Sequence, residues 1–280
     1  MAVVVDSAAS LPIDRGADAP ILVPMQVLID GQAYRDGVDL TPEQLYRKIS
    51  EGSATPTTAA PSPQAFYEAL TQAAQRANSA LCITVARRFS TAYDSAVLAA
   101  ELARARHPGL DVSVFDCGSA AGGEGLVTLA AQRSAETGAT LPDVESAARD
   151  AASGVRLVAY VDTMYYLWRG GRVPGIAHAG ASLLSIKPIF ELANGRISRK
   201  MPSRTLRSAR RRLLNMVVMG VAGRPVTVCV MHAGAPDEAA AVEDALSDTI
   251  DCREIYVAEF SAVMGTHIGP GALGVAYTPA

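Results

Sequence analysis

The sequence Ala2-Val3-Val4-Val5-Asp6-Ser7 is a short unbroken apolar run that ends in two polar residues. This pattern is typical of a strand that is buried in a parallel sheet and then enters a loop. It recurs at residues 81–85 and 112–115. Helix patterns follow these strands at about 63–76, 92–106 and from 120 onward. The repeated strand–loop–helix order predicts an N-terminal domain, residues 1–153, in which a parallel sheet lies between two layers of helices.

The second half of the chain has a less regular pattern. Strand-like segments occur at 157–161, 183–190, 195–198, 226–231 and 254–260, and helix-like segments at about 206–219 and 236–247. An Asn194-Gly195 pair is a hairpin signal between the second and third of these strands. We therefore predict that residues 154–280 form a two-layer α/β domain with a mixed sheet.

Local signals support these elements. Asp30-Gly31 follows an apolar run from residue 21 and predicts a hairpin. Thr41 before Pro42, and Ser62 before Pro63, each predict the start of a helix, because a hydroxyl can cap the first turn and proline suits its first position.

Ligands of parallel α/β sheets bind beyond the carboxyl ends of the strands. Asp6, Ser90 and Asp116 are expected at that edge, and we favour local turn caps as the role of the two aspartates. The stretch from Gly265 to Gly274 is rich in glycine, so we expect a tight turn that brings His267 close to a ligand as a hydrogen-bond donor or a cation.

Composition excludes several classes of function. The net charge of −3 shows no general bias toward nucleic acids or membrane surfaces. The 4 cysteines are far apart and no metal-ligand spacing joins them to histidines. The N-terminus has no basic leader and no apolar run is long enough to span a membrane, so we expect a cytoplasmic protein. Neither a GxxxxGK[ST] loop nor a GxSxG elbow is present, which argues against ATP chemistry and serine hydrolysis.

Several separated motifs resemble one family. They are AVVVDSAASLP, VPMQVLIDGQAYRDGVDL, PTTAAPSP, FSTAYDSA, VDTMYYLWRGGR, LLSIKPIF and GTHIGPGALG, in this order along nearly the whole chain. The chain resembles the DegV family of fatty-acid-binding proteins, which includes the FakB subunits of fatty acid kinases. The resemblance implies a long-chain fatty acid held between two domains as the bound ligand, without a further cofactor. It also implies a separate ATP-dependent kinase subunit that phosphorylates the carboxylate.

The resemblance also implies which residues bind the ligand. The family's threonine, serine, Gly-Gly-Arg arginine and Gly-Thr-His histidine fall on Thr58, Ser90, Arg172 and His267. The neighbouring Ala59-Ala60, Ala86 and Thr91-Ala92 depart from the family's usual residues, and their effect on the ligand stays open.

Two further interpretations stay open at this stage. A basic stripe at helical spacing, Arg204, Arg207, Arg210 and Arg211, is either a solvated helix face or a docking face for an acidic partner such as the kinase, for which Arg204 and Arg207 are the candidates. The alternative function is an enzyme that acts on a small anionic substrate in the same crevice, with His267 as its acid–base group.

The aromatic residues Tyr165, Tyr166 and Trp168 are expected to pack between the domains.

Overall fold

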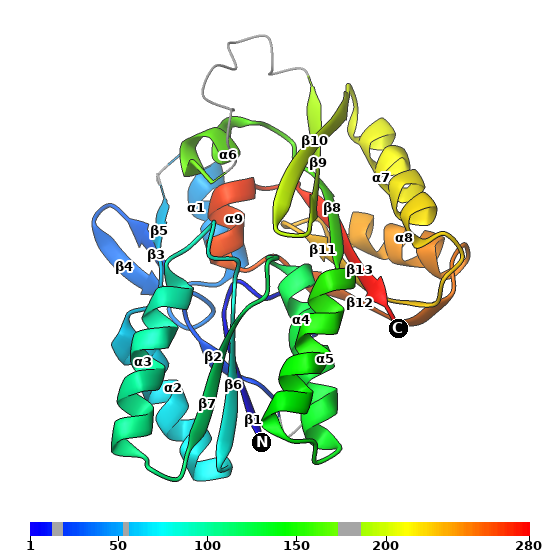
Figure 1. The fold of residues 1–280 in the computed structure, drawn as a ribbon. Helices are drawn as coiled ribbons and strands as arrows, with labels where there is room; N and C mark the ends of the chain where they lie inside the picture. The colour runs from blue at the N-terminus through cyan, green and yellow to red at the C-terminus, as the bar shows by residue number, and fades with distance from the viewer. Residues whose placement is uncertain (13–18, 53–55, 173–185) are drawn as a thin grey trace.

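The computed structural model describes residues 1–12, 19–52, 56–172 and 186–280. A parallel sheet of 4 strands in the order β2-β1-β6-β7 forms the centre of the N-terminal half (Figure 1). Its strands are β1 (Ala2–Asp6), β2 (Ile21–Val23), β6 (Ser79–Thr84) and β7 (Asp111–Asp116). β1 is buried along its whole length and β6 nearly so. This burial on both faces explains the unbroken apolar runs that these strands show in the sequence.

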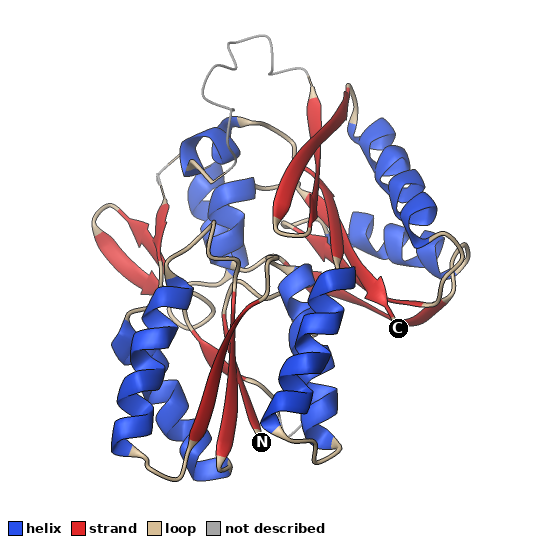
Figure 2. Ribbon diagram, viewed as in Figure 1, coloured by secondary structure: helices blue, strands red, loops and turns tan. Residues whose placement is uncertain are grey.

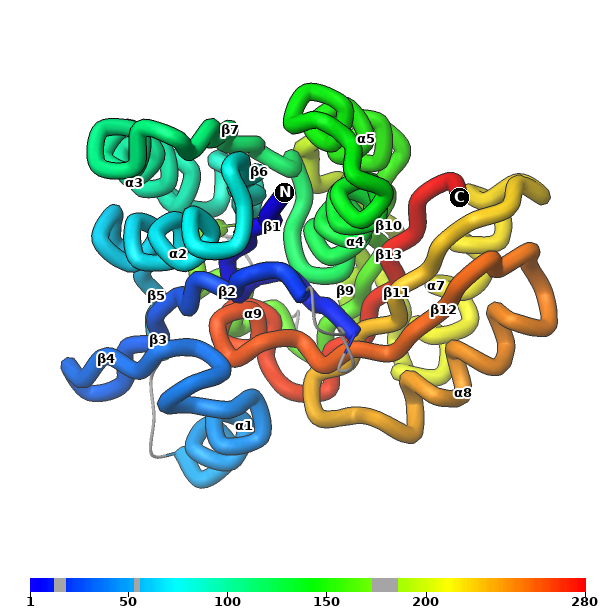
Figure 3. The backbone as a smooth tube through the Cα atoms, turned by 90° about the horizontal axis from the view of Figure 1, so that it is seen from below, coloured from blue at the N-terminus to red at the C-terminus, as the bar shows by residue number. Residues whose placement is uncertain are grey.

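Two pairs of helices cover this sheet (Figures 2 and 3). On one face lie α2 (Pro63–Arg76) and α3 (Ala92–Arg106), and on the other lie α4 (Gly122–Glu136) and α5 (Leu141–Gly154). The Ser62 hydroxyl accepts the Ala65 amide at 3.2 Å, and Pro63 is the first residue of α2, as the sequence predicts. The three-layer arrangement of the N-terminal half is confirmed.

A small antiparallel sheet in the order β4-β3-β5 lies beside the parallel one. Its strands are β3 (Gln26–Ile29), β4 (Gln32–Arg35) and β5 (Thr57–Ala59). The predicted hairpin at Asp30-Gly31 is present, with positive φ angles of 52° and 81°. Helix α1 (Pro42–Ser50) follows it and begins with the predicted cap, in which Thr41 and Gln44 bond reciprocally.

The C-terminal half contains a mixed sheet of 6 strands in the order β10-β9-β8-β13-β11-β12. The strands are β8 (Arg156–Tyr160), β9 (Lys187–Ala193), β10 (Arg196–Ser203), β11 (Val226–His232), β12 (Cys252–Glu259) and β13 (Leu273–Pro279). β11 and β12 are parallel, and the other neighbours are antiparallel. Helices α7 (Leu206–Val221) and α8 (Pro236–Ser247) cover its outer face (Figure 1). The predicted mixed-sheet α/β layer is confirmed.

Helix α4 packs against both large sheets. Its first residue, Gly122, lies so close to β11 that a Cβ atom there would come within 2.7 Å of the Met231 sulfur and 2.8 Å of the Cys229 sulfur. The Gly122 amide donates to that Met231 sulfur at 2.9 Å. Glycine is therefore required at the point where the two halves of the chain meet.

Two short helices differ from the prediction. Helix α6 (Tyr165–Gly170) is not predicted from the sequence. Residues 265–268, for which the glycine-rich sequence predicts a tight turn, belong instead to α9 (Ala262–Ile268). The turn instead begins at Gly269, whose φ is 74°. The predicted strand at 183–190 begins at Lys187 in the structure, and its residues 183–185 lie outside the described residues. The expected domain boundary after residue 153 falls at the C-terminal end of α5, one residue before the helix ends, and the division into two domains stays a prediction.

Within the described residues, no helix is both long and apolar enough to cross a membrane.

Two carboxyl groups are buried in the core below the carboxyl edge of the parallel sheet. Asp6 at the end of β1 accepts the amides of Ala8 at 3.0 Å and Val85 at 2.8 Å. Burial raises its pKa to about 6 despite these bonds. Glu124 on α4 is fully buried, and its carboxyl group lies beside that of Asp6. Burial, and then the Asp6 charge, raise the pKa of Glu124 well above 4.5, so we infer a neutral Glu124 beside Asp6.

This arrangement predicts the pH dependence of stability. The native state holds the Glu124 proton at pH values where the unfolded chain has released it, so the free energy of unfolding should fall as the pH rises. The slope is at most about 1.4 kcal/mol per pH unit for one proton. Glu124→Gln should remove this contribution, which urea unfolding from pH 6 to 8 measures. The exposed Glu101→Gln is the control, and parallel curves for wild type and Glu124→Gln would contradict a buried neutral Glu124.

Candidate functional site

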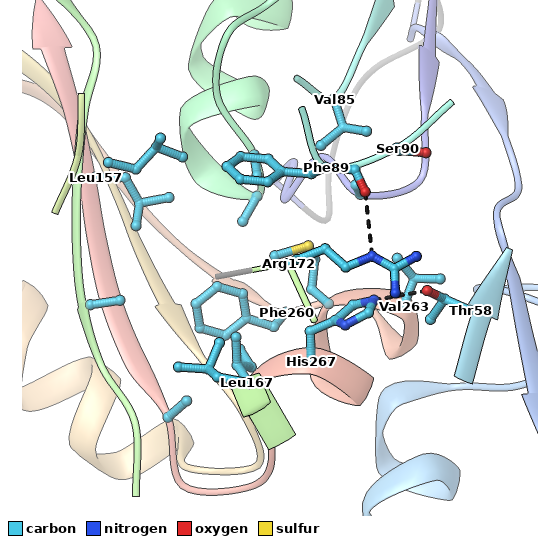
Figure 4. A pocket seen from close by; sticks show the side chains of 18 of the residues that line it. Thr58, Val85, Phe89, Ser90, Leu157, Leu167, Arg172, Phe260, Val263 and His267 are labelled. Carbon is cyan, nitrogen blue, oxygen red and sulfur yellow. Dashed lines mark hydrogen bonds between the residues drawn. The ribbon is translucent and has the colours of Figure 1, made fainter. Parts of the chain in front are cut away.

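An apolar cavity of about 160 Å³ lies between the carboxyl edge of the parallel sheet and the inner face of the mixed sheet (Figure 4). The N-terminal half contributes the loops after β1 and β6 and the start of α4, through Ala8, Val85, Phe89, Ala120 and Ala121. The position agrees with the rule that ligands of parallel sheets bind beyond the strand ends.

The mixed sheet supplies the opposite wall. Leu157 of β8, Leu192 of β9 and Ile197 of β10 are register partners across the three strands and all line the cavity. Helices α6 and α9 add Leu167, Val263 and further apolar residues. Figure 4 shows Leu157 at the end of the cavity away from Thr58. The cavity is thus apolar along its length and has its polar groups near one end.

The polar end contains all four residues expected to bind a ligand: Thr58, Ser90, Arg172 and His267 line the same cavity. Thr58 comes from β5, His267 from the last turn of α9, and Ser90 from the loop before α3. The Thr58 hydroxyl oxygen lies 2.8 Å from His267 Nε2, although 209 residues separate the two in sequence. The structure therefore brings the four residues together, and their role toward a ligand remains a prediction.

His267 is neutral in this environment. Burial first, and then the nearby Arg172 charge, lower its pKa to about 4. Its Nδ1 atom is buried without a hydrogen-bond partner among the described residues. This atom lies against Gly170, where a Cβ would come within 2.4 Å of it. Of the two forms of His267 that the sequence leaves open, burial therefore favours the neutral one at neutral pH.

The same contacts fix the tautomer of His267. A buried N–H group without an acceptor is rarer than an unpaired lone pair, so we place the proton on Nε2 and the lone pair on Nδ1. Nε2 then donates to Thr58 Oγ1, and the Thr58 hydroxyl keeps its own proton to donate onward. A neutral histidine thereby orients a hydroxyl donor toward the cavity.

The cation of the site is Arg172, which is exposed. Its guanidinium donates to the carbonyl oxygens of Gly170 at 2.7 Å and Phe89 at 3.5 Å. Figure 4 shows it beside His267 and Thr58. The Ser90 hydroxyl accepts the Ala92 amide at 3.2 Å, which leaves its proton available to a ligand. The end of the cavity thus offers two hydroxyl donors and one positive charge to an anion.

Other sequence-based expectations have mixed outcomes. The predicted capping roles are confirmed for Asp6 and for Asp116, which accepts the Gly118 amide at 3.0 Å. The expected packing between domains is wrong for Tyr165 and Trp168, which are 49% and 53% exposed, because α6 turns Leu167 inward instead.

The arginine stripe is mostly at the surface. Arg204, Arg207 and Arg211 are exposed, whereas Arg210 is half-buried and pairs with Glu238.

Sequence reasoning missed Asp36, a buried carboxylate that bonds to the first amide of α9 at 2.9 Å. No local pattern marks it, because its partners come from distant parts of the chain. Among the described residues, no group of three or more His, Cys, Asp or Glu side chains could hold a metal ion.

The state of His267 can be measured directly. In ¹⁵N-histidine-labelled protein, we expect the His267 ring to remain in the Nε2–H form from pH 8 to pH 5.5, because its pKa lies near 4. Arg172→Met should raise this pKa, since it removes a neighbouring positive charge, but burial should still hold it below the ordinary value of 6.5. His267→Gln assigns the signal by its loss. A wild-type His267 that titrates near 6.5 would contradict this description of the site.

The chain resembles known proteins over its full length. Residues 1–280 match the family described as "Uncharacterised protein, DegV family". A DegV domain-containing protein of Streptomyces coelicolor is 34% identical over 98% of this chain and 97% of its own. The solved structure of a fatty-acid-binding DegV family protein from Thermus thermophilus is 31% identical and superposes with a TM-score of 0.90 over 100% of this chain and 99% of its own. DegV of Bacillus subtilis, described as a fatty acid binding protein, gives 27% identity and a TM-score of 0.85 over 100% and 99% of the two chains. With its sequence and its fold both matched from end to end, this chain is a member of the DegV family.

Proposed function

We propose that this protein is a carrier that holds one long-chain fatty acid, with the acyl chain in the apolar cavity and the carboxylate at Thr58, Ser90, Arg172 and His267. We further propose that it presents this carboxylate to a separate ATP-dependent kinase in the cytoplasm, which forms the acyl phosphate. The observation that carries the proposal is the long apolar cavity with hydroxyl donors, a neutral imidazole and an exposed arginine near one end.

The energetics favour such a ligand. Each CH₂ group that leaves water contributes roughly 0.8 kcal/mol, so a 16-carbon chain has on the order of 10 kcal/mol of gross driving force before the costs of association. A carboxylate needs hydrogen bonds when it leaves water. The proposed donors provide these bonds, and Arg172 remains at the surface where a partner can reach the bound carboxylate.

The relatives support the same ligand. The structures from Thermus thermophilus and Bacillus subtilis, both described as fatty-acid-binding, share the fold from end to end. Two hydroxyls and a histidine at a cavity end would also suit the alternative, an enzyme for a small anionic substrate. A nucleophile with a histidine base requires a third group that orients the base. His267 Nδ1 has no such partner among the described residues, so we favour the carrier.

A basic hollow near the start of α7 is the proposed docking surface for the kinase. Arg204, Arg211 and Arg212 line it together with Ser203 and Ser208. No described ion pair includes Arg204 or Arg207, and both are exposed. Unpaired surface cations favour an acidic partner and accelerate its association. The solvated-face interpretation of the stripe remains the alternative that the experiment below tests.

The ligand proposal is tested with purified protein. Native mass spectrometry of wild type from cells supplied with fatty acids should detect one retained fatty acid per chain. In palmitate titrations, Thr58→Val and Ser90→Ala should each weaken binding about tenfold or more, because a hydrogen bond to a charged group contributes about 1.5–3 kcal/mol. Thr58→Ser, which keeps the hydroxyl, is the matched control. The proposal would be contradicted if the purified wild type retained no lipid. It would also be contradicted if Thr58→Val and Ser90→Ala both bound palmitate with wild-type affinity.

The partner proposal is tested by charge reversal. Arg204→Glu with Arg207→Glu should reduce acyl-phosphate formation by the cognate kinase by roughly tenfold or more, because like charges then oppose docking, while palmitate affinity stays unchanged. Arg76→Glu with Arg106→Glu makes the same change in charge on exposed residues at the ends of α2 and α3. Equal acyl-phosphate formation with the two double variants would contradict the docking proposal and favour the interpretation of the stripe as a solvated helix face.

A further inference from the structure

Asp36 follows β4 directly and is 3% exposed. Its carboxylate accepts the Ser7 hydroxyl through Oδ2 at 2.7 Å and the Ala262 amide through Oδ1 at 2.9 Å. Ser7 precedes Ala8, which lines the cavity, and Ala262 is the first residue of α9. One side chain therefore joins the loop after β1 to the helix that carries His267.

Met25 completes this connection. Its amide donates to the Ser7 hydroxyl oxygen at 3.0 Å, and its carbonyl oxygen accepts the Asp36 amide at 2.9 Å. Met25 also lines the cavity and immediately precedes β3, the strand that pairs with β5 and thus with Thr58. The network of Ser7, Met25 and Asp36 therefore reaches both the strand pair that holds Thr58 and the helix that holds His267.

Helix α9 has little freedom beyond this point. A Cβ on Gly265 would come within 2.6 Å of the Tyr46 hydroxyl, and a Cβ on Gly269 within 2.0 Å of the Tyr166 ring. The helix is thus packed closely along its length, and the bond from Ala262 to Asp36 sets its start. A shift of that start would be transmitted through this short helix to His267 in its last turn.

The surroundings of Asp36 include hydrogen-bond donors that stabilise its negative charge. Burial raises its pKa from 3.8, and hydrogen bonds from Ser7 and Ser261 and from the amides of Ala262 and Val263 act in the opposite direction. Each of these hydrogen-bond partners donates to the Asp36 carboxylate. Hydrogen bonds to a carboxylate are shorter and stronger than those between neutral groups.

We propose that Asp36 is a positioning residue, which fixes the start of α9 against Ser7 and thereby holds His267 Nε2 at Thr58 Oγ1. Its consequence for ligand affinity rests on the proposed fatty-acid-binding function, but its effect on His267 does not. The tautomer of His267 in the ligand-free protein therefore tests it independently of any ligand.

The test compares ¹⁵N-histidine spectra of ligand-free protein. Asp36→Ala should reduce the Nε2–H signature of His267 toward the mixture of tautomers seen in Thr58→Val, in which Nε2 has lost its acceptor. Asp36→Asn should lie between wild type and Asp36→Ala, because the amide oxygen can still accept from Ala262 but the NH₂ group cannot accept from Ser7. Palmitate affinity should fall tenfold or more in Asp36→Ala.

Leu246→Ala is the matched control for a general loss of stability, because Leu246 is fully buried on α8, on the outer side of the mixed sheet. It should lower the melting temperature without changing the His267 signature. If Asp36→Ala does not fold, Ser7→Ala is the substitute. It removes only the hydrogen bond from the Ser7 hydroxyl to Asp36, and its effect is measured by the same His267 spectrum.

Wild-type His267 signals in the folded Asp36 and Ser7 variants, or an equal change in Leu246→Ala, would overturn the proposal. A failure of the wild type itself to bind palmitate would contradict the proposed function and leave the His267 result valid.

Discussion

The close contact between α4 and the mixed sheet is the constraint on which the rest of the structure depends. Gly122 allows the start of the helix to lie against the sulfur atoms of Met231 and Cys229. Ala120 and Ala121 directly before it then become part of the cavity wall. Since α4 also covers the parallel sheet, this one helix sets the distance between the two sheets and therefore the width of the cavity between them.

The proposed anion site at the polar end of the cavity does not depend on a cationic histidine. A histidine that became charged there would need an acceptor for Nδ1, and none is present among the described residues. Burial favours the neutral imidazole, which can donate to the Thr58 hydroxyl oxygen and leave the hydroxyl proton free to form another hydrogen bond. Arg172 lies at the surface, where its charge remains solvated at little cost.

Buried carboxyl groups surround the same region and have different roles. Asp6 and Asp36 each accept backbone amides and join loops that are distant in sequence. Glu124 is fully buried beside Asp6, and a neutral form is the less costly one for it. Hydrogen bonds to Asp6 and Asp36 thus hold the segments that form the cavity walls.

The sequence by itself determined most of the strands and helices, the caps at Thr41 and Ser62, the hairpin at Asp30-Gly31 and the candidate residues that meet at the polar end. These features follow from hydrophobic periodicity, from turn and cap chemistry within a few residues, and from motifs that resemble a family. Only the tertiary structure decided that residues 262–268 form a helix, because packing against Tyr46 and capping by Ser261 and Asp36 outweigh the low helix propensity of Gly265. The tertiary structure also decided that His267 is neutral and that Asp36 joins Ser7 to the start of α9. Both depend on burial and on contacts between residues far apart in the chain, which no local pattern encodes.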